Sequence, residues 1–184
     1  MAKFEEAIDK VYKLEFNEPA NALHKNKTED DVTFMGVYRT AHPKWEGWKL
    51  VDKYLTMFDN PRAASVAAYE DEQLRELVNQ FYKTYFWDKM GLDKVASQHI
   101  AEEMFVFGVN AGTRVAVKTA QRVVGAKEDG MVGPATVAAL DNYNEDKFDI
   151  RYDAEEVAYY QELVNKNIKF SVYLKGWKNR AEAV

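Results

Sequence analysis

One glutamate stands at a position in the chain that suggests chemistry. Apolar side chains recur at helical spacing between residues 4 and 14, which predicts a helix that ends close to Glu15, before a long polar segment. Where a helix packs such a carboxyl against apolar groups, desolvation favours the protonated form. A protonated carboxyl can act as a general acid, as glycoside hydrolysis requires at the glycosidic oxygen. The chain has 30 acidic residues, so position alone does not distinguish Glu15 from a solvated helix end.

The composition predicts one soluble globular domain. The chain has 184 residues, of which 47% are hydrophobic and 30% charged, and its mean hydropathy is −0.51. No apolar run approaches the roughly 18 residues that a membrane span needs, and the first residues, MAKFEEAIDK, lack the pattern of a signal peptide. We therefore expect a protein that is made in the cytosol and does not insert into a membrane.

Composition and spacing also argue against three kinds of site. The absence of cysteine excludes disulfides and thiolate metal ligands. A net charge of −5 with dispersed basic residues argues against nucleic-acid binding. His42 and His99 do not have the i, i+4 spacing of a zinc-binding helix, so no metal or other cofactor is predicted.

The periodicity predicts a mainly α-helical chain with a small β element near the N-terminus. β-favouring residues around Gly36 predict a short strand or hairpin over residues 33–38. Further helices are predicted over residues 48–58, 74–85, 98–109 and 115–123. The helix over 98–109 is apolar on most sides, which predicts a central position, and Gly125 is the expected C-terminal cap of the one that follows.

The last long helix is predicted to begin at Asp153. Asp153 and Glu156 have the spacing of a capping box, in which each side chain accepts a hydrogen bond from the backbone of the other. The expected buried face of this helix consists of Val157, Tyr160, Val164 and Ile168.

Four segments share their order and character with a known family. They are VYKLEFNEPAN, TFMGVY, FYKTYFWDKMGLDKV and MFVFGVNAGTRVAVKTAQRVVGAKEDGMVGPATVAAL. Together they resemble glycoside hydrolase family 108, the phage-type N-acetylmuramidases, with its predicted peptidoglycan-binding segment. The last segment is the most specific, because it reproduces the family's order and spacing at Asn110-Ala111-Gly112, Ala116, Gln121, Asp129-Gly130 and Gly133-Pro134-x-Thr136.

The resemblance implies a lysozyme-like single domain over residues 1–184. Its catalytic part corresponds to residues 1–95 and a peptidoglycan-binding-like helical part to residues 96–184. The family's catalytic glutamate ends the first helix in an E-G-G segment, which corresponds to Glu15 in Leu14-Glu15-Phe16-Asn17. Phe16 and Asn17 replace the two glycines here, and the family's D-P-G-G-x-T stretch is absent, with an apparent insertion before Thr33.

The second catalytic group is left open among three side chains. His24 can take the place of the family's aspartate as base or water-positioning group, since a neutral imidazole accepts a proton near neutral pH. Asp30 or Asp31 can instead reach in from the loop. Thr33 begins the sequence Thr33-x-x-Gly36-Val37, which resembles the family's T-x-x-G-I, and is expected to hold the attacking water.

Substrate contacts are expected from Asn110, Gly36 and Tyr38. Asn110 can contact the acetamido groups of the sugars or end the buried helix, and the residues leave both roles open. Tyr38 is one of four aromatic side chains considered for stacking on sugar rings, although aromatic residues at helical spacing are more often part of the core. The other three are Trp45, Trp48 and Tyr85.

The function that the resemblance implies is that of a bacteriolytic endolysin, a lysozyme that cleaves the β-1,4 bond between N-acetylmuramic acid and N-acetylglucosamine in peptidoglycan. Glu15 is expected to donate the proton, and direct attack by water predicts inversion. We expect a monomer, made in the host cytoplasm of a phage, that acts on the cell wall after release. Two alternatives remain: a lytic transglycosylase, which closes an anhydro ring without water, and a non-catalytic peptidoglycan-binding or virion structural module.

Overall fold

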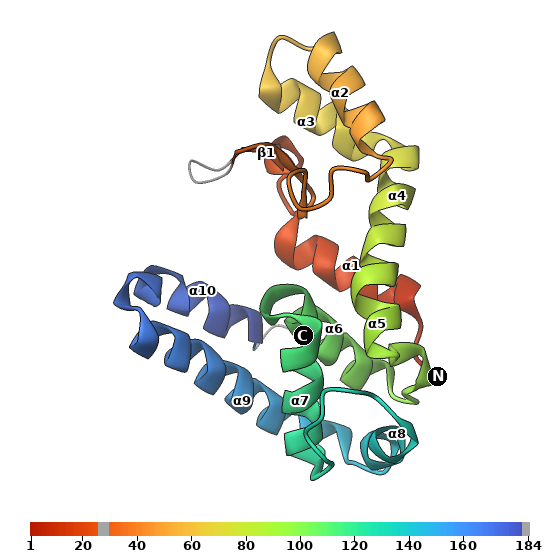
Figure 1. The fold of residues 1–184 in the computed structure, drawn as a ribbon, viewed down its shortest axis with the longest axis vertical. Helices are drawn as coiled ribbons and strands as arrows, with labels where there is room; N and C mark the ends of the chain where they lie inside the picture. The colour runs from red at the N-terminus through yellow and green to blue at the C-terminus, as the bar shows by residue number, and fades with distance from the viewer. Residues whose placement is uncertain (26–29, 182–184) are drawn as a thin grey trace. The chain divides into compact units, whose positions relative to one another are not determined.

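The structure is a computed structural model that describes residues 1–25 and 30–181. The α-helices and strands are α1 (Phe4–Glu15), β1 (Leu23–His24), β2 (Thr33–Phe34), β3 (Val37–Tyr38), α2 (Trp48–Met57), α3 (Pro61–Glu70), α4 (Glu72–Tyr82), α5 (Asp88–Met90), α6 (Gln98–Ala111), α7 (Thr113–Val124), α8 (Pro134–Asp141), α9 (Glu145–Lys166) and α10 (Ser171–Ala181) (Figure 1). Short helical turns connect some of them at η1 (Pro19–Asn21), η2 (Lys83–Trp87), η3 (Leu92–Lys94) and η4 (Ile168–Phe170). The prediction of a mainly α-helical chain with a small β element near the N-terminus is therefore confirmed. Part of the apparent insertion before Thr33, residues 26–29, lies outside the described residues.

The chain forms two compact units. The middle unit is Val11–Thr84, and the terminal unit combines Met1–Lys10 with Tyr85–Val184. The single lysozyme-like domain expected over residues 1–184, with its two parts divided at residue 95, stays a prediction. Among the helices of residues 1–25 and 30–181, none is both long and apolar enough to cross a membrane.

The middle unit is built around a small antiparallel sheet of β1, β2 and β3 in that order. Leu23 pairs with Phe34, and Phe34 with Val37, so these three side chains share one face. All three are buried, which makes this face part of the core. The sheet also contacts α3, which packs against α2 in the same unit (Figure 1). The short hairpin predicted over residues 33–38 is confirmed.

The terminal unit is built around α6. Its residues from Ile100 to Gly108 are all buried, which confirms the predicted central helix. The helices α7 and α9 pack against it, and the ring of Phe107 contacts Tyr152 and Tyr160 of α9 edge to face. Farther along α9, Tyr160 stacks on Trp177 of α10, whose helix runs beside α9 (Figure 1).

The start of α9 differs from the prediction. The helix begins at Glu145 and not at Asp153, because Asn144 already caps it: its side chain accepts a hydrogen bond from the Lys147 backbone at 3.0 Å. Asp153 therefore lies inside the helix, and the predicted capping box is wrong.

The predicted buried face of the last helix is correct for only part of its length. Tyr160 and Val164 are buried, as expected. Ile168 is 73% exposed, because α9 ends at Lys166 and the chain changes direction at Asn167.

Three helices, α3, α8 and α10, were not predicted. The first two begin with a proline. Proline is tolerated at the first helical position because its missing N–H has no partner there anyway. The Asn60 side chain caps α3 by accepting a hydrogen bond from the Arg62 backbone at 2.9 Å.

Gln121 holds the loop between α7 and α8. Its side chain is fully buried, and its amide nitrogen lies 2.9 Å from Asp129 Oδ1, 3.0 Å from the Met131 carbonyl and 3.1 Å from Thr136 Oγ1. Its amide oxygen accepts a hydrogen bond from the Gly130 backbone at 2.9 Å. The residues Gln121, Asp129-Gly130 and Thr136, which carried much of the family resemblance, are thus explained by one hydrogen-bond network.

Replacing Gln121 with alanine should lower the free energy of unfolding by about 3 kcal/mol, because it removes several buried hydrogen bonds at once. Urea unfolding followed by circular dichroism measures this.

The Gln121 hydrogen bond is the main reason that the pKa of Asp129 lies below its ordinary value of 3.8. A carboxylate whose pKa is lowered by folding adds to stability at neutral pH and loses this contribution when it is protonated. The difference in the free energy of unfolding between Gln121→Ala and wild type should therefore become smaller as the pH falls below 3.8. Gln161→Ala, at an exposed position of α9, is the matched control and should change stability by less than about 0.5 kcal/mol. Equal effects of the two substitutions would contradict the assigned role of Gln121.

Candidate active site

Glu15 is the last residue of α1 and is half-buried. It lines a cavity of about 130 Å³ with the residues that follow it, Phe16, Asn17, Glu18, Asn21 and Ala22. The helix ends here, and after an extended Glu18 the chain continues in η1 (Pro19–Asn21). Pockets that enclose whole ligands measure about 300–1,000 Å³, so this cavity has room for one small group of a substrate.

Tyr82 is the residue near Glu15 that the sequence analysis missed. It is 3% exposed, and its hydroxyl donates a hydrogen bond to the Met35 carbonyl at 3.0 Å. Burial raises the pKa of this phenol well above its ordinary value, and the negative charge of Glu15 raises it further. The phenol therefore stays protonated and remains a donor to Met35. The segment FYKTYF, which contains Tyr82, was part of the family resemblance, but helical spacing did not single out this residue.

Phe16 and Gly36 pack around the same phenol. The ring centroids of Phe16 and Tyr82 lie 6.3 Å apart. Gly36 has a φ of +78°, in the left-handed region that favours glycine, and a Cβ atom there would collide with the Tyr82 hydroxyl and lie 3.5 Å from the Phe16 ring. Phe16, which replaces a family glycine, thus belongs to the packing beside Glu15, and Gly36 contributes space rather than a side chain.

His24 is positioned by the backbone just before it. Its Nδ1 atom lies 2.9 Å from the carbonyl oxygen of Asn21, a residue that lines the Glu15 cavity. A carbonyl oxygen can only accept, so Nδ1 carries the proton and donates it. In the neutral imidazole this leaves Nε2 as an acceptor on an exposed side chain. His24 thus has the tautomer that a base or water-positioning group requires.

The sheet brings three of the predicted site residues together. His24 lies opposite Thr33, and Thr33 opposite Tyr38, so their side chains share the face of the sheet that lies away from Leu23, Phe34 and Val37. Thr33 is only 6% exposed, whereas Tyr38 is half-buried and His24 exposed.

The two loop aspartates are held differently. The backbone N–H of Asp30 donates to the Tyr38 hydroxyl at 3.1 Å, which ties the loop to the sheet while the Asp30 residue stays exposed. The carboxylate of Asp31 accepts a hydrogen bond from the backbone of Val32 at 2.7 Å. The lining of the Glu15 cavity includes neither aspartate, nor does it include His24.

Asn110 belongs to the terminal unit and not to the unit of Glu15. It lies exposed in the last turn of α6, where its side-chain nitrogen donates to the Val106 carbonyl at 3.1 Å. This is a hydrogen bond within its own helix, of the kind expected if Asn110 ends the buried helix.

Among the aromatic residues considered for sugar stacking, Trp48 is part of the core. It is 6% exposed, its indole N–H donates to the His42 carbonyl at 2.8 Å, and the Arg39 guanidinium lies 4.5 Å from its ring centroid. Trp45 is half-buried and its ring contacts Trp48. Tyr85 is 48% exposed. Exposure therefore leaves Tyr38, Trp45 and Tyr85 as the accessible rings.

A second cavity lies in the terminal unit, between α7 and α9. Its volume is about 360 Å³, and its lining includes Lys118, Arg122, Glu155, Tyr159 and Glu162. The Arg122 guanidinium bridges Glu128 at 2.7 Å and Glu155 at 2.8 Å. These charged groups, with the Tyr159 ring, give the cavity a polar wall and an aromatic one.

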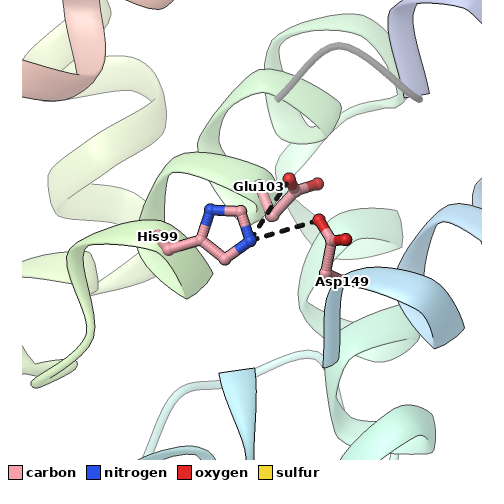
Figure 2. Close-up of side chains that lie close together, drawn as sticks. All are labelled: His99, Glu103 and Asp149. Atoms are coloured by element: carbon pink, nitrogen blue, oxygen red, sulfur yellow. Dashed lines mark hydrogen bonds and ion pairs between the residues drawn. The ribbon is translucent and has the colours of Figure 1, made fainter. Parts of the chain in front are cut away.

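One group of side chains within residues 1–25 and 30–181 has the composition of a metal site. His99, Glu103 and Asp149 each offer one ligand atom, and these atoms all lie within 4.8 Å of one another (Figure 2). The group belongs to the terminal unit, and none of its members lines the Glu15 cavity.

Comparisons with known proteins bear on both units. A family model described as "Glycosyl hydrolase 108" matches residues 21–112, and one described as "Predicted Peptidoglycan domain" matches residues 115–182. No curated protein matches. Among solved structures, SagA of Brucella abortus is similar, with 20% sequence identity and a TM-score of 0.62 over 97% of this chain and 92% of that chain. At this identity the likeness shows a shared fold, and the predicted mainly α, lysozyme-like fold class is confirmed.

Replacing Gly36 with alanine should lower the free energy of unfolding by about 2–4 kcal/mol. Alanine is strained at positive φ, and its Cβ would displace the buried Tyr82 hydroxyl. In the background of Tyr82→Phe, which removes that hydroxyl, the same substitution should cost roughly half as much, and a double-mutant cycle of urea unfolding measures the coupling. Gly133→Ala is the control, because its φ of −94° suits alanine and no atom lies within 4 Å of the added Cβ. If Gly36→Ala lowered the free energy of unfolding equally in the wild-type and Tyr82→Phe backgrounds, the Tyr82 hydroxyl would not be what limits the space at position 36.

Proposed function

Because the chain belongs to the glycosyl hydrolase 108 family, we propose that it cleaves the β-1,4 bond between N-acetylmuramic acid and N-acetylglucosamine in bacterial peptidoglycan, with Glu15 as the proton donor. The match to a peptidoglycan domain over residues 115–182 supports a glycoside hydrolase whose substrate is peptidoglycan. Our proposal therefore concerns which bond in peptidoglycan is cleaved and the role of Glu15 as the general acid.

The position of Glu15 is the observation that carries the proposal. The family match begins at residue 21, six residues after Glu15, so the role of this residue rests on its geometry and on its resemblance to the family glutamate that ends the first helix. Glu15 does end α1, and it lines a cavity with the polar residues Asn17, Glu18 and Asn21. A half-buried carboxyl beside such a cavity can reach a glycosidic oxygen and give it a proton.

His24 is the best candidate for the second catalytic group. Its Nδ1–H donates to the carbonyl of a residue that lines the Glu15 cavity, and its Nε2 is left as an acceptor that can orient a water molecule or take its proton. Water activated in this way attacks the sugar directly, without a covalent intermediate, and inverts the configuration at the anomeric carbon.

Thr33 and Tyr38 are assigned as neighbours of His24 on the same face of the sheet. Since Thr33 is buried, we assign it to positioning His24 from the adjacent strand rather than to direct contact with water. Tyr38, which is half-buried beside Thr33, can add a ring contact to a sugar.

The terminal unit is proposed to bind the cell wall. The cavity between α7 and α9 lies within the residues that match the peptidoglycan domain, and its charged wall suits the carboxylates and amines of stem peptides. In this assignment the protein is a monomeric phage endolysin that degrades the wall after release from the host cytoplasm.

Replacing Glu15 with glutamine should reduce the release of reducing sugars from purified peptidoglycan by at least about 1,000-fold while leaving the fold unchanged. Glutamine has nearly the same shape but cannot donate a proton to the leaving oxygen. Glu18→Gln is the matched control, because Glu18 lines the same cavity three residues after Glu15 and is exposed. Circular dichroism checks the folding of each variant. Full activity of Glu15→Gln would refute the assignment, and an inert wild type that still binds sacculi would favour the non-catalytic module.

Replacing His24 with alanine should lower turnover by about 100-fold, because the attacking water loses the group that orients it. NMR of the newly formed reducing ends should show inversion in the wild type. Mass spectrometry of the same digest separates the alternative reaction, since a lytic transglycosylase leaves 1,6-anhydro ends. Lys25→Ala, at the exposed neighbouring position, is the control and should keep wild-type turnover. Anhydro products, or unchanged turnover in His24→Ala, would exclude His24 as the water-positioning group.

A further inference from the structure

We propose that His99, Glu103 and Asp149 bind one divalent transition-metal ion of the class of Zn²⁺, which joins α6 to α9 in the terminal unit. Two of the ligands lie four residues apart on one face of α6, and the third comes from α9. Sequence analysis compared the histidines with one another and so predicted no metal. The ligand spacing here is His-x₃-Glu, and the third ligand lies 50 residues beyond His99.

The distances suit an ion after a small adjustment. His99 Nε2 lies 3.1 Å from Asp149 Oδ1 and 4.0 Å from Glu103 Oε1 (Figure 2). Ligand atoms about 2.0–2.2 Å from one ion lie roughly 3–3.5 Å from each other. The ligand atoms, which lie within 4.8 Å of one another, therefore have to move closer together when the ion binds.

Glu103 supplies an independent reason to expect a ligand. Glu103 is 1% exposed, and neither of its carboxylate oxygens accepts a hydrogen bond from any residue that the structure describes. Buried polar groups in proteins are nearly always hydrogen-bonded, because burial without a partner costs free energy. The Nε2 atom of His99 lies 4.0 Å from Glu103 Oε1, which is too far for a hydrogen bond. A metal ion in this space would satisfy the carboxylate.

The charges around Glu103 also favour a cation. Asp149, Asp153 and Glu156 of α9 face it, and Lys10 of α1 is the basic group that opposes them. The Lys10 ammonium pairs with Glu102 at 3.0 Å, so its charge is shared. The acidic groups that face Glu103 therefore outnumber the two nearby basic groups, Lys10 and His99, and a bound cation would offset their charge.

The ligand types select the class of ion. One imidazole nitrogen with carboxylate oxygens suits Zn²⁺ and its neighbours in the transition series, whereas Ca²⁺ takes six to eight oxygen ligands. Three protein ligands leave at least one position for water. An ion can enter from solvent, because the side chains of His99 and Asp149 are 33% and 39% exposed. The proposed ion would act by holding α6 and α9 together, and it involves none of the residues assigned to catalysis.

The test is binding of Zn²⁺ alone to the full chain after removal of metals with EDTA. Isothermal titration calorimetry should show one equivalent bound to the wild type, and at a free concentration 100 times Kd the melting temperature should rise by about 5 °C or more. Glu103→Gln and Asp149→Asn should each weaken binding by on the order of 100-fold. Asp149→Asn changes a partly exposed residue and should fold even if the buried substitution does not. Ca²⁺ at the same concentration should produce no shift.

The matched control is Glu162→Gln, which removes an exposed carboxylate elsewhere on α9 that pairs only with Lys166 in the described structure. It should bind Zn²⁺ as the wild type does. Two results would overturn the proposal: no Zn²⁺ bound by the wild type at 100 µM, taken as about the weakest affinity that a site of three protein ligands should have, or binding that is unchanged in both Glu103→Gln and Asp149→Asn. The second result would assign the metal to another part of the chain.

Discussion

The hydroxyl of Tyr82 determines the shape of the surroundings of Glu15. It donates to the Met35 carbonyl and fills the space that any side chain at position 36 would need. This is why the turn between β2 and β3 requires glycine, and why that turn can lie so close to Phe16, the residue directly after the proposed acid. Because the phenol is buried and keeps its proton, the contact persists across the pH range in which a hydrolase works. Loss of this one hydrogen bond would loosen the turn and, with it, the strands that carry His24 and Thr33.

The terminal unit depends on a different balance, between the apolar burial of α6 and the ionisable groups that this helix brings into the core. Nine consecutive residues of α6 are buried, so any polar residue among them has to find its partners inside the protein. Glu102 does so through Lys10 and Gln98. Glu103 does not accept a hydrogen bond from the described residues, and its position next to acidic residues of α9 makes it the least satisfied group of this core. A carboxylate in that setting is stabilised either by a proton or by a cation.

The network around Gln121 shows how a family motif can be structural. Residues 121, 129, 130 and 136 were recognised from their order and spacing, in a segment that resembles a peptidoglycan-binding domain. In the structure they hold one loop, through hydrogen bonds from a single buried amide. The charged cavity between α7 and α9 lies elsewhere in the same unit, and its lining residues had no sequence signal of their own. Spacing thus identified the residues that hold the loop, whereas the cavity exists only through the packing of α7 against α9.

Local physical rules in the sequence were sufficient for most elements. The helix that ends at Glu15, the hairpin around Gly36 and the buried helix α6 follow from hydrophobic periodicity and turn chemistry, which act over a few residues. The same rules failed where a residue type is compatible with two local structures. Proline can end a helix or begin one, and Pro61 and Pro134 begin helices. Aspartate can cap a helix or lie inside one, and Asp153 lies inside the helix that Asn144 caps.

The placement of Glu15 and His24 as candidate residues came from the sequence and its resemblance to a family. Only the tertiary structure decided what surrounds them. The charge of Glu15 acts on Tyr82, His24 shares a sheet face with Thr33, and His99 lies beside Asp149. Each of these arrangements joins residues from different elements of the chain. Such contacts depend on how elements pack, and periodicity along one element carries no information about its partner.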